Sequence, residues 1–332
     1  MDKAIHRAFE VPLEKPEYID VDGVLFPRGE ITAVGGPRGL GKSSFNAWVA
    51  SRVSRMGLRS LTANGEDRIW VTRARIQGSG GDLRRSFIVD LMDIPQLPDD
   101  LDRLEGYMRQ TKADVIMLDP AALVIKPPLR SDQPVRQALM PLGELARKYN
   151  AAIILIAHLL KHPSKKGHPL DALPGNGIAN SVRMAYLFGV DPHDPEQRAL
   201  YMAKHQYGPD GRGYTFSLTE QILKSKEHGK VPVGKLDILD NHADLFWYDM
   251  LPKSDKPISA NEIKLEIAEI FLLEMFHHEK KRLASDIVVE AEKRKISRKT
   301  YDKAKAKLGI KSVREGGNKK QVWWWVMGED KE

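Results

Sequence analysis

The feature that most restricts how this chain can fold is a glycine-rich segment near its N-terminus. Residues 35–44 read GGPRGLGKSS, with Gly36 followed after four residues by Gly41, Lys42 and Ser43. Glycines at this spacing allow backbone N–H groups to turn inward on a row of phosphates, and the N-terminus of a following helix adds positive potential. The segment therefore predicts a phosphate-binding loop between a buried strand and a helix.

The side chains of this loop indicate the chemistry that it serves. Lys42 is expected to reach the terminal phosphates and to take part in catalysis, and Ser43 is expected to hold Mg²⁺. The expected nucleotide is ATP, bound by Gly36, Pro37, Arg38, Gly39, Leu40, Gly41, Lys42, Ser43 and Ser44. A fortuitous glycine-rich turn is the alternative. Kinases, GTPases, transporters and motors share such loops, so the rest of the chain must indicate what hydrolysis drives.

Short apolar segments alternate with helix-like segments along most of the chain. Strands are expected at 31–34, 58–63, 86–91, 115–118 and 152–157, and helices from residue 42, after residue 63 and at about 134–149. Strands embedded between helices form an α/β fold with a mostly parallel sheet and helices on both faces. Further strands at one edge are expected at 183–190, 199–207 and 212–218. The expected domains are an ATPase domain at 1–250, a linker at 251–259 and a small second domain at 260–332.

Acidic residues follow two strands that should end at the same sheet edge as the loop. Asp119 closes the run ADVIMLDP and is expected to hold the metal opposite Ser43, although an Asp after a strand is often a turn former. Glu66 and Asp67 follow the strand at 58–63, and Glu66 is expected to act as general base for an attacking water. The alternative is that both acids only favour a helix N-terminus.

With these elements in order, the chain resembles the RecA-like hexameric ATPases of the RepA type, which are plasmid and phage replicative helicases related to DnaB. The resemblance covers about residues 19–218 and rests on the loop, the Glu66-Asp67 pair and a His-x-x-Lys motif at His158 and Lys161. It implies a RecA-like P-loop core, ATP and Mg²⁺ as ligands, and a homo-oligomer in the form of a hexameric ring. It also implies that His158 senses the terminal phosphate. The alternative is an ordinary histidine at a strand end.

The resemblance further implies that a neighbouring subunit supplies a catalytic cation to each site. The family pattern is a Lys, often with an Arg two residues later, before a glycine-containing turn, and here it reads AKHQYGPDGRG. Lys204 matches the Lys, whereas Gln206 stands at the Arg position. Arg183 or Arg212 could compensate. A surface lysine at a strand end is the alternative for Lys204.

A long segment rich in Pro, Gly and Lys separates His158 from Arg183. Loops of this length in compact domains are usually functional or disordered. In a ring, Lys161, Lys165 and Lys166 are expected to line a central channel and to hold single-stranded DNA by its backbone. The alternative is a solvated run of charges.

Positive charge is concentrated in the C-terminal part of the chain. The net charge is +7, and residues 293–320 contain 12 Lys or Arg against 2 acids. Such asymmetry points to an anionic partner for this part. Helices are expected at 261–276, 284–296 and 297–309, followed by a hairpin, which is the pattern of a winged helix-turn-helix.

Four basic residues of this part are expected to contact DNA phosphates. Lys299, Lys303 and Lys307 recur every four residues on one face of the third helix, and Arg314 lies on the hairpin. Contacts with protein are the alternative. Two of the three tryptophans at 323–325 are expected to face the core, because side chains alternate along a strand.

The remaining composition bears on compartment and membrane association. The chain has no cysteine, which excludes disulfides and Cys-ligated zinc and suits a reducing compartment. Its first residues lack the apolar core of a signal peptide. The longest apolar run, 151–157, is far shorter than the roughly 20 residues that a membrane-spanning helix needs. We expect a cytoplasmic protein with no membrane partner.

Together these features favour an ATP-dependent hexameric DNA helicase or translocase that acts on single-stranded and forked DNA during replication of a plasmid, phage or other mobile element. The initiator and primase are expected to be separate proteins. The alternative is a DNA-bound ATPase switch that does not translocate, such as a replication regulator or recombination mediator, and Gln206 favours it. A small-molecule kinase would leave the basic C-terminal part unexplained.

Overall fold

The chain forms two compact units, Met1–Pro252 and Lys253–Glu332. The computed structural model describes residues 6–160, 167–225, 227–251, 260–276, 279–315 and 322–327. All but the first residue of the linker expected at 251–259 lie outside these described residues. The linker and the domain boundaries therefore stay predictions.

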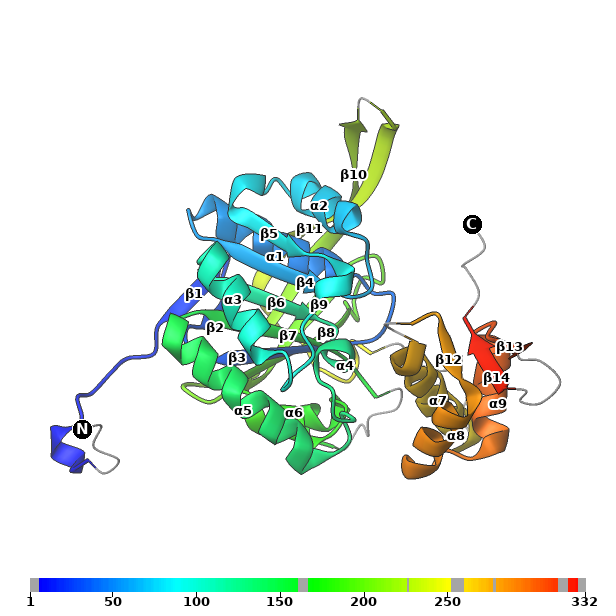
Figure 1. Ribbon diagram of the computed structural model, residues 1–332. Helices are drawn as coiled ribbons and strands as arrows, with labels where there is room; N and C mark the ends of the chain where they lie inside the picture. Colours follow the sequence, from blue (N-terminus) through cyan, green and yellow to red (C-terminus); the bar gives the residue numbers. More distant parts are fainter. Residues whose placement is uncertain are drawn as a thin grey trace. The chain divides into compact units, whose positions relative to one another are not determined.

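A nine-stranded sheet forms the centre of the first unit (Figure 1). Its strand order is β11-β10-β9-β8-β3-β7-β6-β4-β5. Neighbouring strands from β8 to β5 run parallel, whereas β9, β10 and β11 add to one edge in antiparallel pairs. The strands are β3 (Ile31–Gly36), β4 (Ser60–Asn64), β5 (Ser86–Val89), β6 (Val115–Asp119), β7 (Ala152–His158), β8 (Met184–Val190), β9 (Arg198–His205), β10 (Gly213–Ser225) and β11 (Gly229–Ala243). The predicted α/β fold with a mostly parallel sheet is confirmed.

Helices cover both faces of this sheet. On one face α3 (Leu101–Thr111), α5 (Asp132–Tyr149) and α6 (Asn176–Ser181) pack on the strands through one hydrophobic cluster. On the other face α1 (Lys42–Arg55), α2 (Ile69–Gly78) and a β1–β2 hairpin pack through a second cluster. The remaining elements are β1 (Tyr18–Val21), β2 (Val24–Pro27), α4 (Ala121–Val124) and the 3₁₀ helices η1 (Ala8–Glu10), η2 (Leu83–Arg85), η3 (Leu91–Asp93) and η4 (Pro169–Ala172). None of the helices in the described part of the chain is both long and apolar enough to span a lipid bilayer.

The inner strands are buried because their sequences are apolar on both sides. β6 reads VIMLD and β7 reads AIILIAH, and such continuous apolar runs are typical of parallel strands that helices cover on both faces. Successive side chains alternate, so that Ile153 and Leu155 join the first cluster and Ile154 and Ile156 join the second. Polar side chains follow at the carboxyl ends of these strands, where the candidate site lies.

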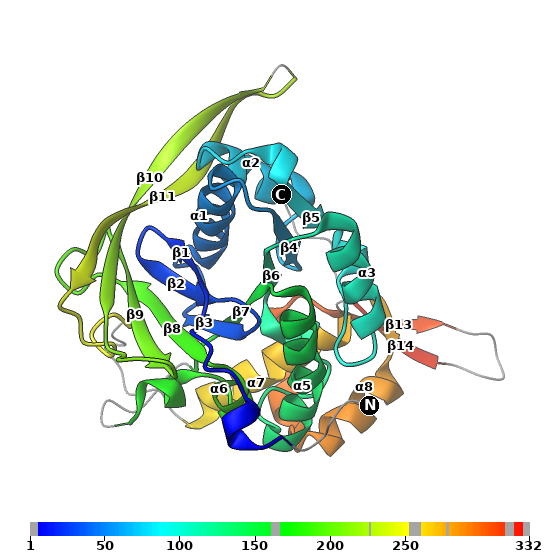
Figure 2. The same cartoon turned by 90° about the vertical axis from the view of Figure 1, so that its left-hand side faces the viewer.

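Several elements of the first unit are missing from the sequence prediction, namely the β1–β2 hairpin, α3, α4, α6 and β11. β11 contains Pro232 and two glycines, which are residue types that argue against a strand. It forms because it pairs with β10 along a long antiparallel ribbon, in which Pro232 lies opposite Ile222. The end of this ribbon projects beyond the rest of the unit (Figures 1 and 2).

The second unit contains the three helices and the hairpin that the sequence predicts, and one further strand. Its elements are α7 (Ala260–Phe276), β12 (Lys281–Leu283), α8 (Ala284–Lys293), α9 (Arg298–Lys307), β13 (Lys311–Glu315) and β14 (Val322–Val326). The three strands pair antiparallel in the order β12-β14-β13. Tyr301 and Ala304 of α9 are buried in the core of this unit.

The tryptophans of β14 differ from the prediction. Trp325 is 6% exposed and belongs to the core, whereas Trp323 is 51% exposed. Trp323 and Trp325 point to the same face, but β12 pairs only with the segment from Trp324 onward, so Trp323 lies on the part of the hairpin that extends past β12. The expectation that two of the three tryptophans face the core is therefore wrong.

Candidate nucleotide-binding site and nucleic-acid surface

The loop between β3 and α1 has the backbone geometry that its glycines predict. Gly39 and Gly41 have φ angles of +75° and +98°, which favour glycine because other residues rarely adopt them. A Cβ atom at Gly36 would lie 2.8 Å from the carbonyl oxygen of Phe188 on β8. Glycine is therefore required at the first position by packing and at the other two by the turn of the backbone.

Lys42 lies at the start of α1 and is almost fully buried, with 6% of its surface exposed. Its Nζ donates a hydrogen bond to the carbonyl oxygen of Pro37, at 2.7 Å. Burial lowers the pKa of Lys42 to about 8, although the carboxylates of Asp119 and Glu66 raise it. A cation with so little hydration gains strongly from a nearby anion such as a phosphate.

Asp119 ends β6 at the same edge of the sheet, where it lies beside Asn64 of β4. It is 1% exposed, and Ser43 Oγ lies 3.5 Å from its Oδ2. Burial, together with the neighbouring Glu66, raises the pKa of Asp119 to about 7, although Lys42 lowers it. Two side chains that the sequence assigns to the metal therefore meet, although they come from different elements.

This pair of oxygen ligands fits the expected Mg²⁺. A hydroxyl and a carboxylate are hard ligands, and Mg²⁺ at phosphate-binding sites usually takes one or two protein oxygens together with phosphate oxygens and waters. No group of three or more His, Asp or Glu side chains that could hold a metal occurs among the described residues. Ser43 and Asp119 are the residues that would hold the ion.

Glu66 follows β4 in a turn that Asn64 organises. Asn64 Oδ1 accepts hydrogen bonds from the backbone N–H groups of Glu66 and Asp67, at 2.9 and 3.1 Å. The carboxylate of Asp67 pairs with Arg75 and accepts a further hydrogen bond from Asn64 Nδ2. Neither acid caps α2, whose first turn contains no acidic residue. Asp67 is thus engaged in structure, and Glu66 is the acid left for proton transfer.

The carboxylate of Glu66 contacts His158 at the end of β7. His158 lies beside Gly36 across the β3–β7 pair, and its Nε2 donates to Glu66 Oε1 at 3.0 Å. This hydrogen bond lowers the pKa of Glu66, more than burial raises it. Glu66 is therefore ionised near neutral pH, which a general base requires. His158 Nδ1 is buried and has no hydrogen-bond partner among the described residues.

Two further residues of this site are absent from the sequence prediction. Asn46 Nδ2 donates to Asp119 Oδ2 at 2.9 Å, and Asn46 is buried. Its position three residues after Ser43 in α1 is a usable signal, since residues at that spacing share a helix face. Arg198 of β9 donates to the carbonyl oxygen of Leu40 in the loop, at 2.8 Å. No local pattern indicates this contact, because 158 positions separate the two residues.

Lys204 lies at the opposite end of the sheet from the loop of its own chain. It pairs with Ala185 at the start of β8, and its Nζ donates to the carbonyl oxygen of Ala179 at 2.9 Å. Arg183 donates to Gln206 Oε1 at 2.9 Å in the same region. Arg212 lines a separate cavity of about 490 Å³ with His205 and His242. Lys204 and Arg183 therefore do not reach the loop of their own chain.

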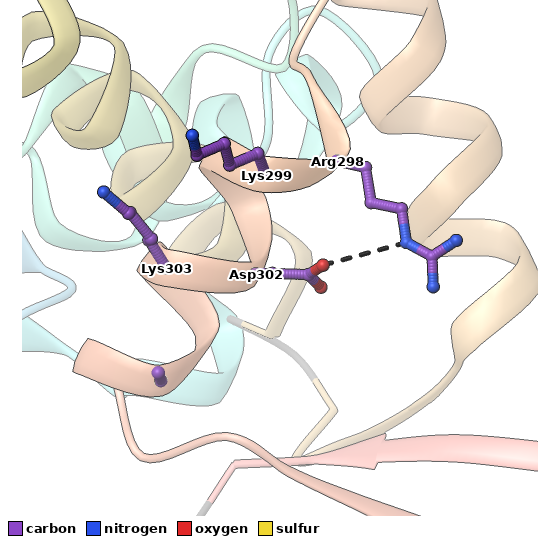
Figure 3. A pocket seen from close by; sticks show the side chains of 5 residues that line it. Arg298, Lys299, Asp302 and Lys303 are labelled. Atoms are coloured by element: carbon purple, nitrogen blue, oxygen red, sulfur yellow. Dashed lines mark ion pairs between the residues drawn. The ribbon is translucent and has the colours of Figure 1, made fainter.

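The expected nucleic-acid contacts fall into two groups. Lys161, Lys165 and Lys166 lie outside the described residues. Lys299 and Lys303 are exposed and project to the same side of α9, where they line an open depression of about 640 Å³ (Figure 3).

The remaining basic residues of the second unit differ in their surroundings. Lys307 pairs with Glu269 of α7, whose Oε1 lies 2.7 Å from Lys307 Nζ, so it is less available than Lys299 and Lys303. Arg298 pairs with Asp302 at 3.7 Å. Arg314 is exposed on β13.

Comparison with known proteins bears mainly on the first unit. The AAA domain family (AAA_25) matches residues 4–164, a little under half of the chain, and this span includes the loop, Glu66, Asp119 and His158. No curated protein matches the chain. The match and the geometry of the loop support an ATPase.

Solved structures that are similar to this chain include a helicase and the ATPase domain of a second protein. The helicase is a DnaB-like replicative helicase described with its interactions with primase, at 14% identity and a TM-score of 0.47 over 58% of this chain and 56% of that chain. The ATPase domain matches at 14% identity and a TM-score of 0.45 over 57% of this chain and 82% of that chain. This chain thus covers little more than half of the length of the DnaB-like helicase.

Proposed function

We propose that this protein is an ATPase of the RecA-like helicase type, which hydrolyses ATP and couples hydrolysis to movement along DNA. The observation that carries the proposal is the convergence of Lys42, Ser43, Glu66, Asp119 and His158 at one edge of the sheet. These residues come from four strands or strand-to-helix loops, so the fold as a whole builds the site.

The contacts of these residues suggest how hydrolysis proceeds. The carboxylate of Glu66 accepts a proton from a water molecule as the water oxygen attacks the terminal phosphorus, and ADP leaves with the electrons of the broken P–O bond. His158 fixes the orientation of that carboxylate through the 3.0 Å hydrogen bond. Lys42 offsets the charge of the terminal phosphates. Mg²⁺ bound by Ser43 and Asp119 would supply further neutralisation of phosphate charge.

The position of Lys204 supports an arrangement in which copies of the chain complete one another's sites. Lys204 lies at the far end of the sheet from its own loop, so the nucleotide it could contact belongs to another copy. The proposed assembly is a hexameric ring, with Lys161, Lys165 and Lys166 along its channel on single-stranded DNA. The second unit, proposed as a winged helix, would hold forked or duplex DNA through Lys299, Lys303 and Arg314.

The cellular context remains part of the proposal. It includes a cytoplasmic location, a role in replication of a plasmid, phage or other mobile element, and a separate initiator and primase. These points come from the sequence and from the family resemblance.

A DNA-bound ATPase switch that does not translocate is the second candidate. The observation that favours it is Gln206, which occupies the position of the expected Arg and accepts a hydrogen bond from Arg183. Without the Arg, a neighbouring copy would stabilise less of the charge that develops on the transferred phosphoryl group. Hydrolysis would then be slow, as suits a switch.

ATPase and strand-separation assays of the purified protein test the proposal. We expect hydrolysis that single-stranded DNA stimulates, separation of a forked duplex, and loss of both in Lys42→Ala. Lys15→Ala is the matched control, because Lys15 is exposed and distant in sequence from the loop. Stimulated hydrolysis without strand separation in either polarity would favour the switch, and hydrolysis retained by Lys42→Ala would reject the site.

Mixing experiments separate a coordinated ring from independent subunits. When wild-type protein is mixed with Lys204→Ala, a ring whose copies share sites loses more activity than the fraction of variant added. A strictly proportional loss would mean that the copies work independently. It would remove the support that Lys204 gives to the proposed translocating ring.

A further inference from the structure

The β13–β14 hairpin of the second unit carries an exposed tryptophan beside a cation. Trp323 is 51% exposed, and the Arg314 guanidinium lies 5.6 Å from the centroid of its ring. The two residues lie opposite each other across the hairpin, so they share one face of it. An indole left half in water forgoes the stabilisation that burial would give. This arrangement favours a ligand that covers the ring.

A line of positive charge continues from Trp323 along the same face. Two residues further along β14, Trp325 lies under Lys305 of α9, whose Nζ is 4.1 Å from the ring centroid. Lys305 also donates to Ser312, which lies opposite Trp325. Alternate positions on a strand are about 7 Å apart, so Arg314 and Lys305 follow each other along this face. Neither cation forms an ion pair with a described acidic residue.

An aromatic ring with a track of cations suits an unpaired nucleotide strand. A nucleobase stacks on an aromatic side chain whatever its sequence, and the cations hold the phosphates. A base inside a duplex cannot do this, because its neighbours cover both of its faces. The core of a protein interface is an inferior match, because lysine is depleted there.

We propose that Trp323 stacks on an unpaired base while Arg314 and Lys305 hold phosphates of the same strand. Because Lys299 and Lys303 of α9 offer charge without an aromatic ring, they suit duplex phosphates. The second unit then recognises the junction between single-stranded and double-stranded nucleic acid. This inference rests on the proposed DNA-binding role of that unit.

The neighbouring Trp324 provides a matched control on the other face of the hairpin. It lies opposite Val313 and Leu283. Lys281 Nζ is 4.8 Å from its ring centroid, but this lysine already pairs with Glu315 at 2.6 Å. Trp324 is therefore the same residue type in the same strand, with its cation already neutralised.

A binding experiment with three labelled DNA probes tests this inference. Fluorescence anisotropy measures the affinity of the full-length chain for each probe in the absence of nucleotide. The probes are a fork with oligothymidylate arms, the same fork with abasic arms, and the blunt duplex. We expect the wild type to prefer the fork that has bases in its arms. Trp323→Ala should lose that preference by roughly fivefold or more, Trp323→Phe should retain part of it, and Trp324→Ala should keep it. Binding of the blunt duplex should not change in any of the three variants.

The outcomes distinguish this inference from the proposed DNA-binding role of the second unit, on which it rests. Equal binding of the two forks by the wild type, an unchanged preference in Trp323→Ala, or an equal loss in Trp324→Ala would each overturn base stacking by Trp323. If Lys299→Ala nevertheless weakens binding of all three probes, the DNA-binding role of the unit stands without the stacking. If no probe binds, both fail. Tighter binding of a fork with oligouridylate arms would identify RNA as the natural strand.

Discussion

The nucleotide site and the α9 surface use charge in opposite ways. Lys42 and Asp119 are 6% and 1% exposed, and burial moves the pKa of each toward neutrality. Lys299 and Lys303 are exposed to water. In a poorly solvated site each interaction is strong and each group depends on its neighbours, whereas water and salt screen exposed charges so that they act almost independently. Single substitutions should therefore have large effects at the nucleotide site and small, additive effects on α9.

The largest effect should come from Glu66→Gln. The amide keeps the size of the side chain but cannot accept the proton, so we expect the hydrolysis rate to fall by about 10²- to 10⁴-fold. Nucleotide binding, measured by a fluorescent ATP analogue, should change little. Asp67→Asn is the matched control, because Asp67 is paired with Arg75. Asp67→Asn should lower the free energy of unfolding while keeping most of the hydrolysis rate. A larger loss of rate in Asp67→Asn than in Glu66→Gln would indicate that Asp67 is the base.

The parts of the site that the sequence predicts are those that a local pattern encodes. The glycine spacing predicts the backbone of the loop, and acidic residues after apolar runs predict Asp119 and Glu66, because parallel strands deliver their carboxyl ends to one edge. The alternation of strands and helices is likewise a local pattern, and it predicts the mostly parallel sheet. The structure adds that Asp67 is held by Arg75, which separates two adjacent acids that the sequence presents alike.

Contacts between distant segments escape the sequence. Arg198 reaches Leu40 across 158 positions, and Lys307 is neutralised by Glu269 from another helix although its spacing matches that of Lys299 and Lys303. The long β11 is also missed, since its Pro and Gly residues are tolerated only because β10 provides a partner along its length. In each case the deciding interaction is tertiary.

Asp119→Asn should reveal how much stability the buried carboxylate costs. The folded pKa of about 7 lies above the ordinary value of 3.8, so between about pH 4 and pH 7 the folded state binds more protons than the unfolded state. Stability contributed by this group therefore falls as pH rises through that window. The asparagine has no charge to bury. At about pH 8 the free energy of unfolding of the variant should therefore exceed that of the wild type by up to about 4 kcal/mol.

Urea unfolding of the two proteins, without nucleotide and with a metal chelator, measures this difference. The gain should shrink as pH falls through that window and approach zero below about pH 3, where the wild-type carboxyl is protonated in both states. Loss of the interaction with Lys42 reduces the gain, because Asp119 favours the charged form of that lysine. A variant less stable than the wild type at the higher pH would show that Lys42, Ser43 and Asn46 fully compensate the buried charge.

The smallest effects should come from the lysines of α9. Lys299→Ala and Lys303→Ala should each weaken duplex DNA binding by a few-fold, add in the double variant, and each reduce the slope of log K against log salt by about one. Lys307→Ala should leave that slope nearly unchanged, because Glu269 already neutralises Lys307. It should instead lower the free energy of unfolding, since it leaves the buried carboxylate of Glu269 without its cation. Equal changes of slope for all three lysines would mean that the Lys307–Glu269 pair opens on DNA. A loss of binding in the double variant well beyond the sum of the two single losses would show that this surface behaves like the buried site.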